Sequence, residues 1–368
     1  MGVISRQSIR QLSSLGACCS KGFISLPPLW EDGSPLVCTA AVCLYAAGKT
    51  LPPGEYSQIR IKNLCGPEPL FMKGAYTMVV LEYKGARMEV AELGAEMRRF
   101  VSTDGVERIW SGDPAVWKST APVLFPTINL LKNGVVTIEG REWAVPKHGF
   151  AKYRQFELTA QGEDYLTFTL TADEETRAVY PFEFALHVTH RFTEGGFETT
   201  YVVENRSGRQ MPFVIGGHPG FTCPMAEGEK FTDYVLRFEK PEDGRHLLCD
   251  ADHLICGEET SDLGEDHRTL TLRYEEFDRL DTYIFAGLNS RSVELIHKEH
   301  GHGIRVSFPM EVLAVWTMPG KCAPYLCIEP WQGLPPLADE SGLFEDKPYH
   351  ITLAAGESYT CGYRMEVI

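Results

Sequence analysis

The stretch that decides the fold is Phe-Glu-Phe-Ala-Leu-His-Val-Thr-His-Arg-Phe-Thr-Glu-Gly-Gly-Phe-Glu-Thr-Thr-Tyr-Val-Val, residues 182–203. Apolar side chains occupy every second position from Phe182 to Val188, and polar or small side chains lie between them. A period of two is typical of a β-strand with one buried face. Gly195 and Gly196 then supply a tight turn, so residues 197–203 are expected to return as the second strand of a hairpin.

The same pattern extends from Tyr76 to the end of the chain. Further hairpins are predicted between residues 156–159 and 165–171, and between residues 293–297 and 304–308. This region has no helical heptads, no internal repeats and no glycine-rich phosphate loop, so nucleotide-dependent chemistry has no support. The sequence therefore predicts an all-β protein, a large antiparallel β-sandwich.

Composition limits the partners. The 368 residues include 43% hydrophobic and 11% aromatic side chains, enough for a sizeable core, and the net charge is -15. An acidic protein is a poor ligand for nucleic acid, so a small neutral substrate fits better. No apolar run approaches the roughly 18 residues of a membrane span, which argues against a membrane partner. The sequence leaves the oligomeric state open.

The first 72 residues differ from the rest. They hold 6 Lys and Arg against 4 Asp and Glu, whereas residues 73–368 hold 29 against 46. Five of the 11 cysteines and none of the 11 histidines fall there, and residues 51–73 are rich in proline and glycine. We interpret residues 1–72 as a leader outside the catalytic core and residues 73–368 as the catalytic domain. An odd cysteine count without paired spacing favours free thiols in the cytoplasm.

Three short clusters join reactive side chains to glycine or proline. They are centred on His148, His218 and Glu329. Taken singly, each residue is more often structural than catalytic, as a hydrogen-bonded histidine or a turn-capping carboxylate. Together, a carboxylate of pKa near 4 and imidazoles near 6.5 supply a base and an acid. A glycosidase would need two facing carboxylates, so one glutamate with histidines suits proton shuttling better.

These clusters and others in the same order resemble the galactose mutarotase-like aldose 1-epimerases, specifically their LacX-like branch. The resemblance runs from about Tyr76 to the C-terminus. Its motifs are Ala91-Glu92-Leu93-Gly94-Ala95-Glu96, Trp110-Ser111-Gly112-Asp113-Pro114, Ala121-Pro122-Val123-Leu124-Phe125-Pro126, His148-Gly149-Phe150-Ala151, Gly217-His218-Pro219-Gly220-Phe221 and Ile328-Glu329-Pro330-Trp331-Gln332-Gly333.

The resemblance implies an isomerase that interconverts hexose anomers by opening and re-closing the sugar ring. It places His218 as general acid, Glu329 as general base, His148 as a substrate-binding residue and Asp281 as a ligand of a sugar hydroxyl. It implies no cofactor and no metal.

One position departs from the family pattern. Relatives carry a sugar-contacting arginine where this chain has Leu130, and leucine has no hydrogen-bond donor in its side chain. Asn129 is adjacent, but on a strand it would face the opposite side. Two alternatives to the epimerase therefore stay open. One is a non-catalytic sugar-binding or regulatory protein of the same fold.

The other alternative is a hexose-6-phosphate 1-epimerase, which needs basic residues at the pocket rim. The candidates for that rim are Lys118, Lys132, Lys147 and Lys152. A separate histidine cluster, His297, His300 and His302, also suggests a metal, but Gly301 and Gly303 favour a solvated hairpin tip.

Overall fold

The computed structural model describes residues 30–31, 34–35 and 77–368. The first two segments form strands β1 (Trp30–Glu31) and β2 (Ser34–Pro35), which pair antiparallel. The strands from β3 onward belong to one compact unit, Cys65–Ile368. The predicted leader, residues 1–72, lies outside the described residues except for these four positions, so its boundary stays a prediction.

The hairpin that decides the fold forms as predicted. Strand β11 (Phe184–Thr193) pairs antiparallel with β12 (Gly196–Asn205), and buried side chains alternate along both. Gly195 turns the chain with a positive φ of 75°. A Cβ at Gly196 would lie 1.9 Å from the carbonyl oxygen of Met365 on the next strand, so only glycine lets the strands close up here.

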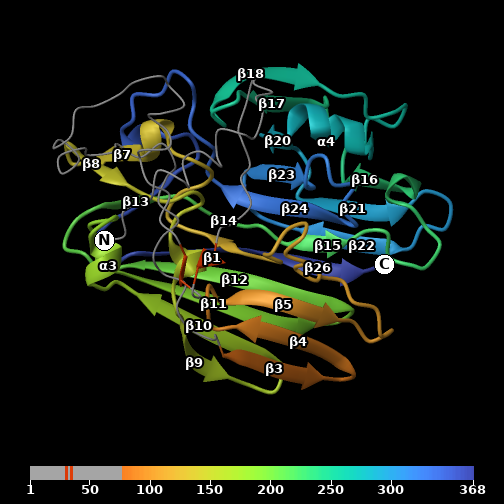
Figure 1. Ribbon diagram of the computed structural model, residues 1–368, viewed down its shortest axis with the longest axis horizontal. Coiled ribbons are helices and arrows are strands. Elements are labelled where there is room, and N and C mark those ends of the chain that lie inside the picture. Colours follow the sequence, from red (N-terminus) through yellow and green to blue (C-terminus); the bar gives the residue numbers. More distant parts are fainter. Residues whose placement is uncertain (1–29, 32–33, 36–76) are drawn as a thin grey trace. The chain divides into compact units, whose positions relative to one another are not determined.

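This hairpin lies inside a nine-stranded antiparallel sheet, which also contains the other two predicted hairpins (Figure 1). The strand order is β19-β16-β21-β22-β26-β12-β11-β10-β9. The remaining strands of this sheet are β9 (Glu157–Gln161), β10 (Tyr165–Thr171), β16 (Tyr234–Phe238), β19 (Thr269–Thr271), β21 (Ser292–His297), β22 (Gly303–Ser307) and β26 (Ser358–Val367).

A second, eight-stranded antiparallel sheet carries the residues of interest. Its order is β18-β17-β20-β23-β24-β14-β6, and β15 also pairs with β24. Its strands are β6 (Val123–Leu124), β14 (Ile215–Gly217), β15 (Gly220–Thr222), β17 (Arg245–Cys249), β18 (Ile255–Thr260), β20 (Thr282–Ala286), β23 (Val312–Trp316) and β24 (Tyr325–Gln332). All eight residues of β24 are buried, which makes it the central strand of this sheet.

The two sheets share one hydrophobic core, and this confirms the predicted β-sandwich. Phe238 on β16 meets Phe285 on β20 with ring centroids 5.2 Å apart, joining the nine-stranded sheet to the eight-stranded one. Sequence reasoning could predict this layering because strands with one apolar face must bury it against another layer.

A three-stranded sheet packs on the nine-stranded one. Its strands are β3 (Met78–Tyr83), β4 (Ala86–Ala91) and β5 (Glu96–Val101). Phe100 on β5 contacts Phe197 on β12 with ring centroids 4.8 Å apart, and truncating either ring to alanine would cost about 3–5 kcal/mol. His190 on β11 reaches across to this sheet: its Nε2 donates to the Ala95 carbonyl at 2.9 Å, and its Nδ1 accepts from Thr199 at 2.9 Å.

The other elements of residues 77–368 are short. Two pairs of strands are β7 (Val135–Ile138) with β8 (Arg141–Ala144), and β13 (Met211–Phe213) with β25 (Ile351–Leu353). The helices are α3 (Glu174–Arg177), α4 (Tyr274–Leu280) and the 3-10 turns η1 (Lys132–Gly134), η2 (Ala151–Tyr153), η3 (Phe231–Asp233) and η4 (Phe344–Asp346). A membrane-crossing helix, long and apolar enough for the task, is not found in the described part of the chain.

Candidate active site

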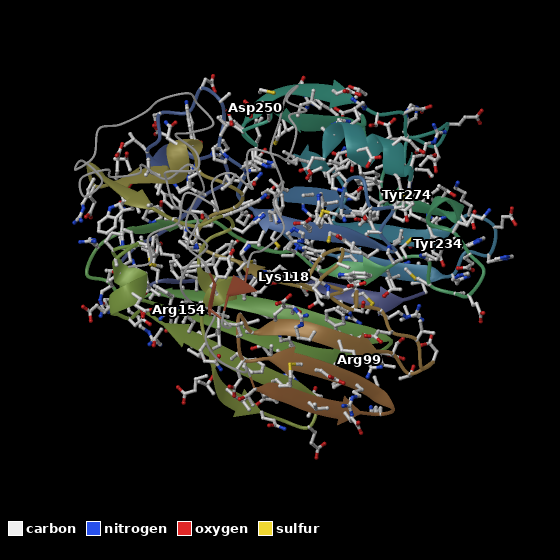
Figure 2. The ribbon with its side chains drawn as sticks, viewed as in Figure 1. Arg99, Lys118, Arg154, Tyr234, Asp250 and Tyr274 are labelled. Carbon is white, nitrogen blue, oxygen red and sulfur yellow. The ribbon has the colours of Figure 1, made fainter. Side chains whose placement is uncertain are left out.

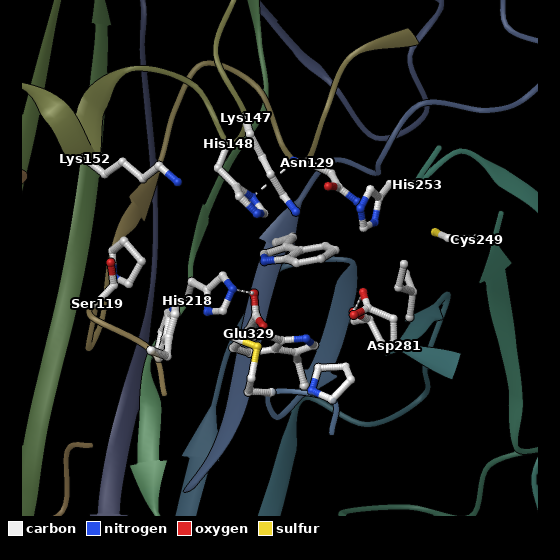
Figure 3. A pocket seen from close by; sticks show the side chains of 18 residues that line it. Ser119, Asn129, Lys147, His148, Lys152, His218, Cys249, His253, Asp281 and Glu329 are labelled. Carbon is white, nitrogen blue, oxygen red and sulfur yellow. Dashed lines mark hydrogen bonds and ion pairs between the residues drawn. The ribbon is translucent and has the colours of Figure 1, made fainter. Parts of the chain in front are cut away.

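A cavity of about 370 Å³ opens beside the buried strand β24 (Figure 3). This volume is at the lower end of the range for small-molecule pockets. The four site residues predicted from the sequence, His148, His218, Asp281 and Glu329, all line it. The other lining residues are Trp117, Ser119, Pro122, Asn129, Lys147, Lys152, Cys249, His253, Thr282, Ile284, Trp316, Met318, Pro319 and Trp331.

Glu329 lies in the middle of β24, opposite Ala314 of β23, and is only 1% exposed. Burial raises the pKa of its carboxyl group well above the ordinary value, and the negative charge of Asp281 adds to this. Trp331 and the positive charge of Lys147 act in the opposite direction but do not outweigh them. Burial therefore favours the protonated form of this carboxyl group more than in an exposed glutamate.

His218 sits between β14 and β15, in the glycine-rich turn that the sequence singled out. Its backbone N–H donates to the Pro122 carbonyl at 3.0 Å. A Cβ at Gly217 would come within 2.7 Å of Tyr201 and Tyr363, so the backbone fits only because the neighbour is glycine. Burial, with a smaller contribution from the charge of Lys152, lowers the pKa of His218 to about 3.

The two residues form a pair: Nε2 of His218 lies 3.3 Å from a carboxylate oxygen of Glu329 (Figure 3). The ordinary pKa values near 4 and 6.5 that the sequence suggested are wrong for this pair, because burial disfavours the charged form of each group. Both shifts favour the state in which the pair holds a single proton. That proton can sit on the carboxyl group, or on the imidazole as an ion pair, without any change in total charge.

His148 is fixed by Asn129. The Asn129 N–H donates to Nδ1 of His148 at 3.2 Å, and the Asn129 carbonyl accepts from the His148 N–H at 3.0 Å. With Nδ1 acting as acceptor, the neutral ring carries its proton on Nε2. Both residues have positive φ angles, 60° and 63°. The next residue must be glycine, since a Cβ at Gly149 would lie 2.0 Å from the Phe125 carbonyl oxygen.

This turn corrects the prediction about Asn129 and Leu130. The prediction assumed a strand, in which Asn129 would face away from the cavity. The positive φ of Asn129 instead brings it into the cavity lining, whereas Leu130 is 38% exposed and does not line the cavity. The side chain at position 130 therefore contributes no group to the cavity lining in this chain.

Asp281 follows helix α4 and lines the cavity beside the start of β20. It too has a positive φ, 63°, and its carboxylate accepts a hydrogen bond from the Thr282 hydroxyl at 3.0 Å. One carboxylate oxygen therefore already has a protein partner, and the group remains able to accept hydrogen bonds from a ligand.

Aromatic rings enclose His218. The ring of Trp117 lies 5.0 Å from the imidazole, and that of Trp316 lies 5.5 Å away in an edge-on arrangement. Trp331, two residues after Glu329, also lines the cavity. Sequence reasoning missed Trp316 and His253, because neither stands in a motif; Trp316 ends an ordinary buried strand, and His253 lies in the turn between β17 and β18.

The four rim lysines predicted from the sequence separate into two groups. Lys147 and Lys152 line the cavity and are half-buried. Lys132 instead donates to the carbonyl groups of Ala338 and Glu340, and Lys118 is exposed outside the lining. Of the four candidates, only Lys147 and Lys152 therefore line the cavity; spacing along the chain could not say which lysines face inward.

The histidine-rich hairpin was only partly predicted. His300 is exposed, as expected for a hairpin tip. His297 is buried, and its Nδ1 accepts from the backbone N–H groups of Glu299 and His300 at 3.2 Å. The prediction of a solvated cluster was thus wrong for His297, because its buried ring accepts hydrogen bonds from the backbone of the turn.

Among residues 77–368, the side chains that lie close enough together to share a metal ion are His218, Cys327 and Glu329, whose ligand atoms are within 4.8 Å of one another. Burial, together with the charge of Glu329, raises the pKa of the Cys327 thiol well above its ordinary value. A metal would need the thiolate, so these residues fit an ion poorly.

Comparison with known proteins assigns the chain. The family model for aldose 1-epimerase matches residues 77–366. The chain belongs to the aldose 1-epimerase family. Protein LacX of Lactococcus lactis subsp. lactis, in its plasmid form, is 32% identical over 273 residues, which cover 70% of this chain and 88% of that protein.

Solved structures agree on the fold of this aldose 1-epimerase family member. The galactose mutarotase related enzyme from Lactobacillus acidophilus superimposes with a TM-score of 0.74 at 27% identity, covering 79% of this chain and 97% of that one. A galactose mutarotase-like protein from Lactobacillus casei gives a TM-score of 0.74 at 29% identity, covering 79% and 100%. The galactose mutarotase-like fold predicted from the sequence is therefore confirmed.

Proposed function

We propose that this member of the family is an active aldose 1-epimerase that interconverts the α and β anomers of a hexose. The observation that carries the proposal is the contact between Glu329 and His218, buried together at the wall of a cavity of small-molecule size. A general acid and a general base must both lie within reach of the reacting atoms, and this pair meets that requirement.

In the proposed mechanism, Glu329 removes the proton of the anomeric hydroxyl while His218 donates a proton to the ring oxygen. The bond between C1 and the ring oxygen breaks, and the electron pair of the departing O–H bond forms the aldehyde. Rotation about the C1–C2 bond and closure with the roles reversed give the other anomer. Ring opening adds a proton to Glu329 and removes one from His218, and ring closure reverses both transfers. After one full reaction both residues are back in their starting protonation states.

The assignment requires the ion-pair form, carboxylate with imidazolium. Burial favours the neutral form in the free protein, but both forms hold the same single proton. They differ by one proton transfer over a contact of 3.3 Å. A sugar whose hydroxyl groups hydrogen-bond to the pair would stabilise its charged form, because hydrogen bonds to charged groups are stronger than those to neutral ones.

The remaining lining residues are proposed to hold the sugar. His148 presents Nε2–H as a donor, and Asp281 offers carboxylate oxygens as acceptors for hydroxyl groups. Trp117 and Trp316 supply apolar surface for the faces of a pyranose ring. The catalytic domain is proposed to span residues 73–368, and the cytoplasm remains the proposed location on the cysteine pattern alone.

A second candidate is a sugar-binding or regulatory protein that keeps the pocket without turnover. The observation that favours it is Leu130, which lies outside the cavity lining and leaves the family arginine without a replacement at that position. The pocket of this candidate would bind the same sugars.

The test is the rate of anomer exchange, measured by NMR with glucose, galactose and their 6-phosphates. The wild type should accelerate exchange of at least one sugar. Glu329→Gln and His218→Gln should each slow turnover by about 10²- to 10⁴-fold, because neither amide can transfer the proton. Glu311→Gln, at a carboxylate that pairs with Arg291, is the control and should behave as wild type. A wild type that binds these sugars but never accelerates exchange would establish the binding-protein alternative.

A further inference from the structure

Two lysines reach the cavity without an ion-pair partner among the residues that the structure describes. Lys147 directly precedes His148, and Lys152 lies on η2 (Ala151–Tyr153). Figure 3 shows both side chains reaching into the cavity beside His148, above His218 and Glu329 in this view. No ion pair within 4.0 Å joins either amino group to a carboxylate of the described residues. The amino group of Lys152 lies 4.9 Å from the centre of the Tyr153 ring, a contact that does not neutralise its charge. Both charges are therefore available to an anionic ligand.

Two carboxylates whose charges act on these lysines make their contacts with other groups. Glu96, whose charge acts on Lys152, accepts the backbone N–H of Thr120 at 2.6 Å and lies 3.2 Å from Arg98. Asp281, whose charge acts on Lys147, accepts from the Thr282 hydroxyl. Neither carboxylate closes an ion pair with the lysine it influences.

Elsewhere the fold pairs its cations when it buries them. Lys347 is almost fully buried and contacts Glu340 at 2.9 Å. Even the more exposed Arg99, labelled in Figure 2, contacts both Glu89 and Glu107. The protein has a net charge of -15 and therefore more carboxylates than basic side chains. A shortage of carboxylates does not explain why the two cavity lysines form no ion pair.

Burial without a carboxylate partner destabilises the charged form of both lysines. Burial lowers the pKa of Lys152 to about 8, and the like charge of Lys147 contributes. Burial also lowers the pKa of Lys147, against the pull of Asp281 and Glu329. A half-buried ammonium without a partner is destabilised until an anion approaches it. An anionic ligand would offset this loss of solvation when it binds.

We propose that Lys147 and Lys152 form a subsite for an anionic group, so that the substrate is an aldose carrying a phosphate or a carboxylate away from its anomeric carbon. This deepens the proposed function and rests on it for the placement of the sugar. The anomeric carbon must meet Glu329 and His218, so the amino groups of Lys147 and Lys152, which line the same cavity, are left to contact other parts of the sugar. Lysine suits this task because its ammonium group binds phosphate as a point charge.

Exchange kinetics test the preference. For the wild type, kcat/KM should be at least about tenfold higher for glucose 6-phosphate or galactose 6-phosphate than for the parent sugar, since a charge-assisted hydrogen bond is worth about 1.5–3 kcal/mol. Lys147→Gln and Lys152→Gln should each reduce this ratio about tenfold or more. Lys298→Gln removes the same charge from an exposed hairpin, where its amino group bonds the Thr232 carbonyl, and should keep the ratio. Glucuronate, compared with glucose 6-phosphate, decides between carboxylate and phosphate.

Binding gives a readout that needs no turnover. The sugar 1,5-anhydroglucitol lacks an anomeric hydroxyl and cannot be epimerised. Calorimetry should show its 6-phosphate binding at least about tenfold more tightly than the unphosphorylated compound, and each lysine variant should remove most of the difference. Added salt should weaken the difference as well.

The outcomes separate the two proposals. Exchange of neutral and anionic sugars at equal efficiency, with lysine variants like wild type, overturns the anionic subsite and leaves the epimerase intact. A protein inert toward every sugar that still binds the 6-phosphate through the two lysines keeps the subsite and overturns the epimerase. Failure to bind either the 6-phosphate or glucuronate more tightly than the parent sugar overturns the subsite in both cases.

Discussion

Asn129 and His148 exchange two hydrogen bonds, one from each backbone N–H, and this exchange fixes the imidazole so that Nε2 carries the proton. We expect His148→Asn to raise KM for the sugar by about tenfold, the equivalent of one lost hydrogen bond of about 1.4 kcal/mol, with a smaller change in kcat. His300→Asn, at the exposed hairpin tip, is the matched control. A drop in kcat of several hundredfold with KM unchanged would instead make His148 part of the proton transfer.

The pH dependence of turnover follows from the opposed pKa shifts of the catalytic pair. The pair takes a second proton only below the pKa of His218, about 3, and loses its single proton only above the raised pKa of Glu329. With a neutral sugar, kcat/KM should therefore show no inflection near pH 6.5 from the imidazole, and should fall as the pH rises through the raised pKa of Glu329. A wild-type inflection near 6.5 that disappears in His218→Gln would show that the imidazole keeps its ordinary pKa.

His190 makes the free energy of unfolding depend on pH, independently of any effect of pH on catalysis. Burial lowers its pKa to about 4, against an ordinary value of about 6.5 in the unfolded chain. Between these values the unfolded chain binds a proton that the native protein does not, so stability falls as the pH drops below 6.5. The loss should reach about 2 kcal/mol at pH 5.

Urea unfolding of wild type and His190→Gln at pH 7 and pH 5 measures that contribution. The variant should be less stable at pH 7, because it loses hydrogen bonds to Ala95 and Thr199 worth about 1 kcal/mol each, but should lose less between the two pH values. His300→Gln should follow the wild type. Equal pH slopes for wild type and His190→Gln would mean that His190 does not supply the dependence.

A chain that begins at Met72 should be soluble and as active as the full chain. Within the described part of the chain, the lining residues of the cavity fall between Trp117 and Trp331, and the matched family region begins at residue 77. Melting temperature and exchange rate of both forms provide the measurement. Aggregation of the shortened chain, or a much lower melting temperature, would place part of residues 1–72 in the core.

The sequence predicted most where local pattern and chemistry agree. The hairpin of β11 and β12 was predictable because alternating side chains and two glycines specify strands and turn together. The shared cavity of His148, His218, Asp281 and Glu329 followed from the family resemblance, since no spacing rule brings residues 181 positions apart into contact.

Three features lay beyond the sequence for physical reasons. The position of Asn129 depends on a positive φ, which alternation cannot reveal. The inward direction of Lys147 and Lys152, but not of Lys118 and Lys132, depends on how loops fold over the sheet. The pKa values of Glu329 and His218 depend on burial, which is a property of the assembled core rather than of either residue.

The site residues are carried by two kinds of structure, a buried strand and a loop segment. Glu329 belongs to a strand buried along its whole length, while Lys147, His148 and Lys152 stand on a segment outside the named strands. Evolution can therefore alter that segment, by substitution or insertion, without disturbing the strand that carries Glu329, the proposed base. A scaffold arranged in this way can pass from one sugar to another while its reaction stays the same, and exchanging the segment between relatives is the direct route to engineering new specificity.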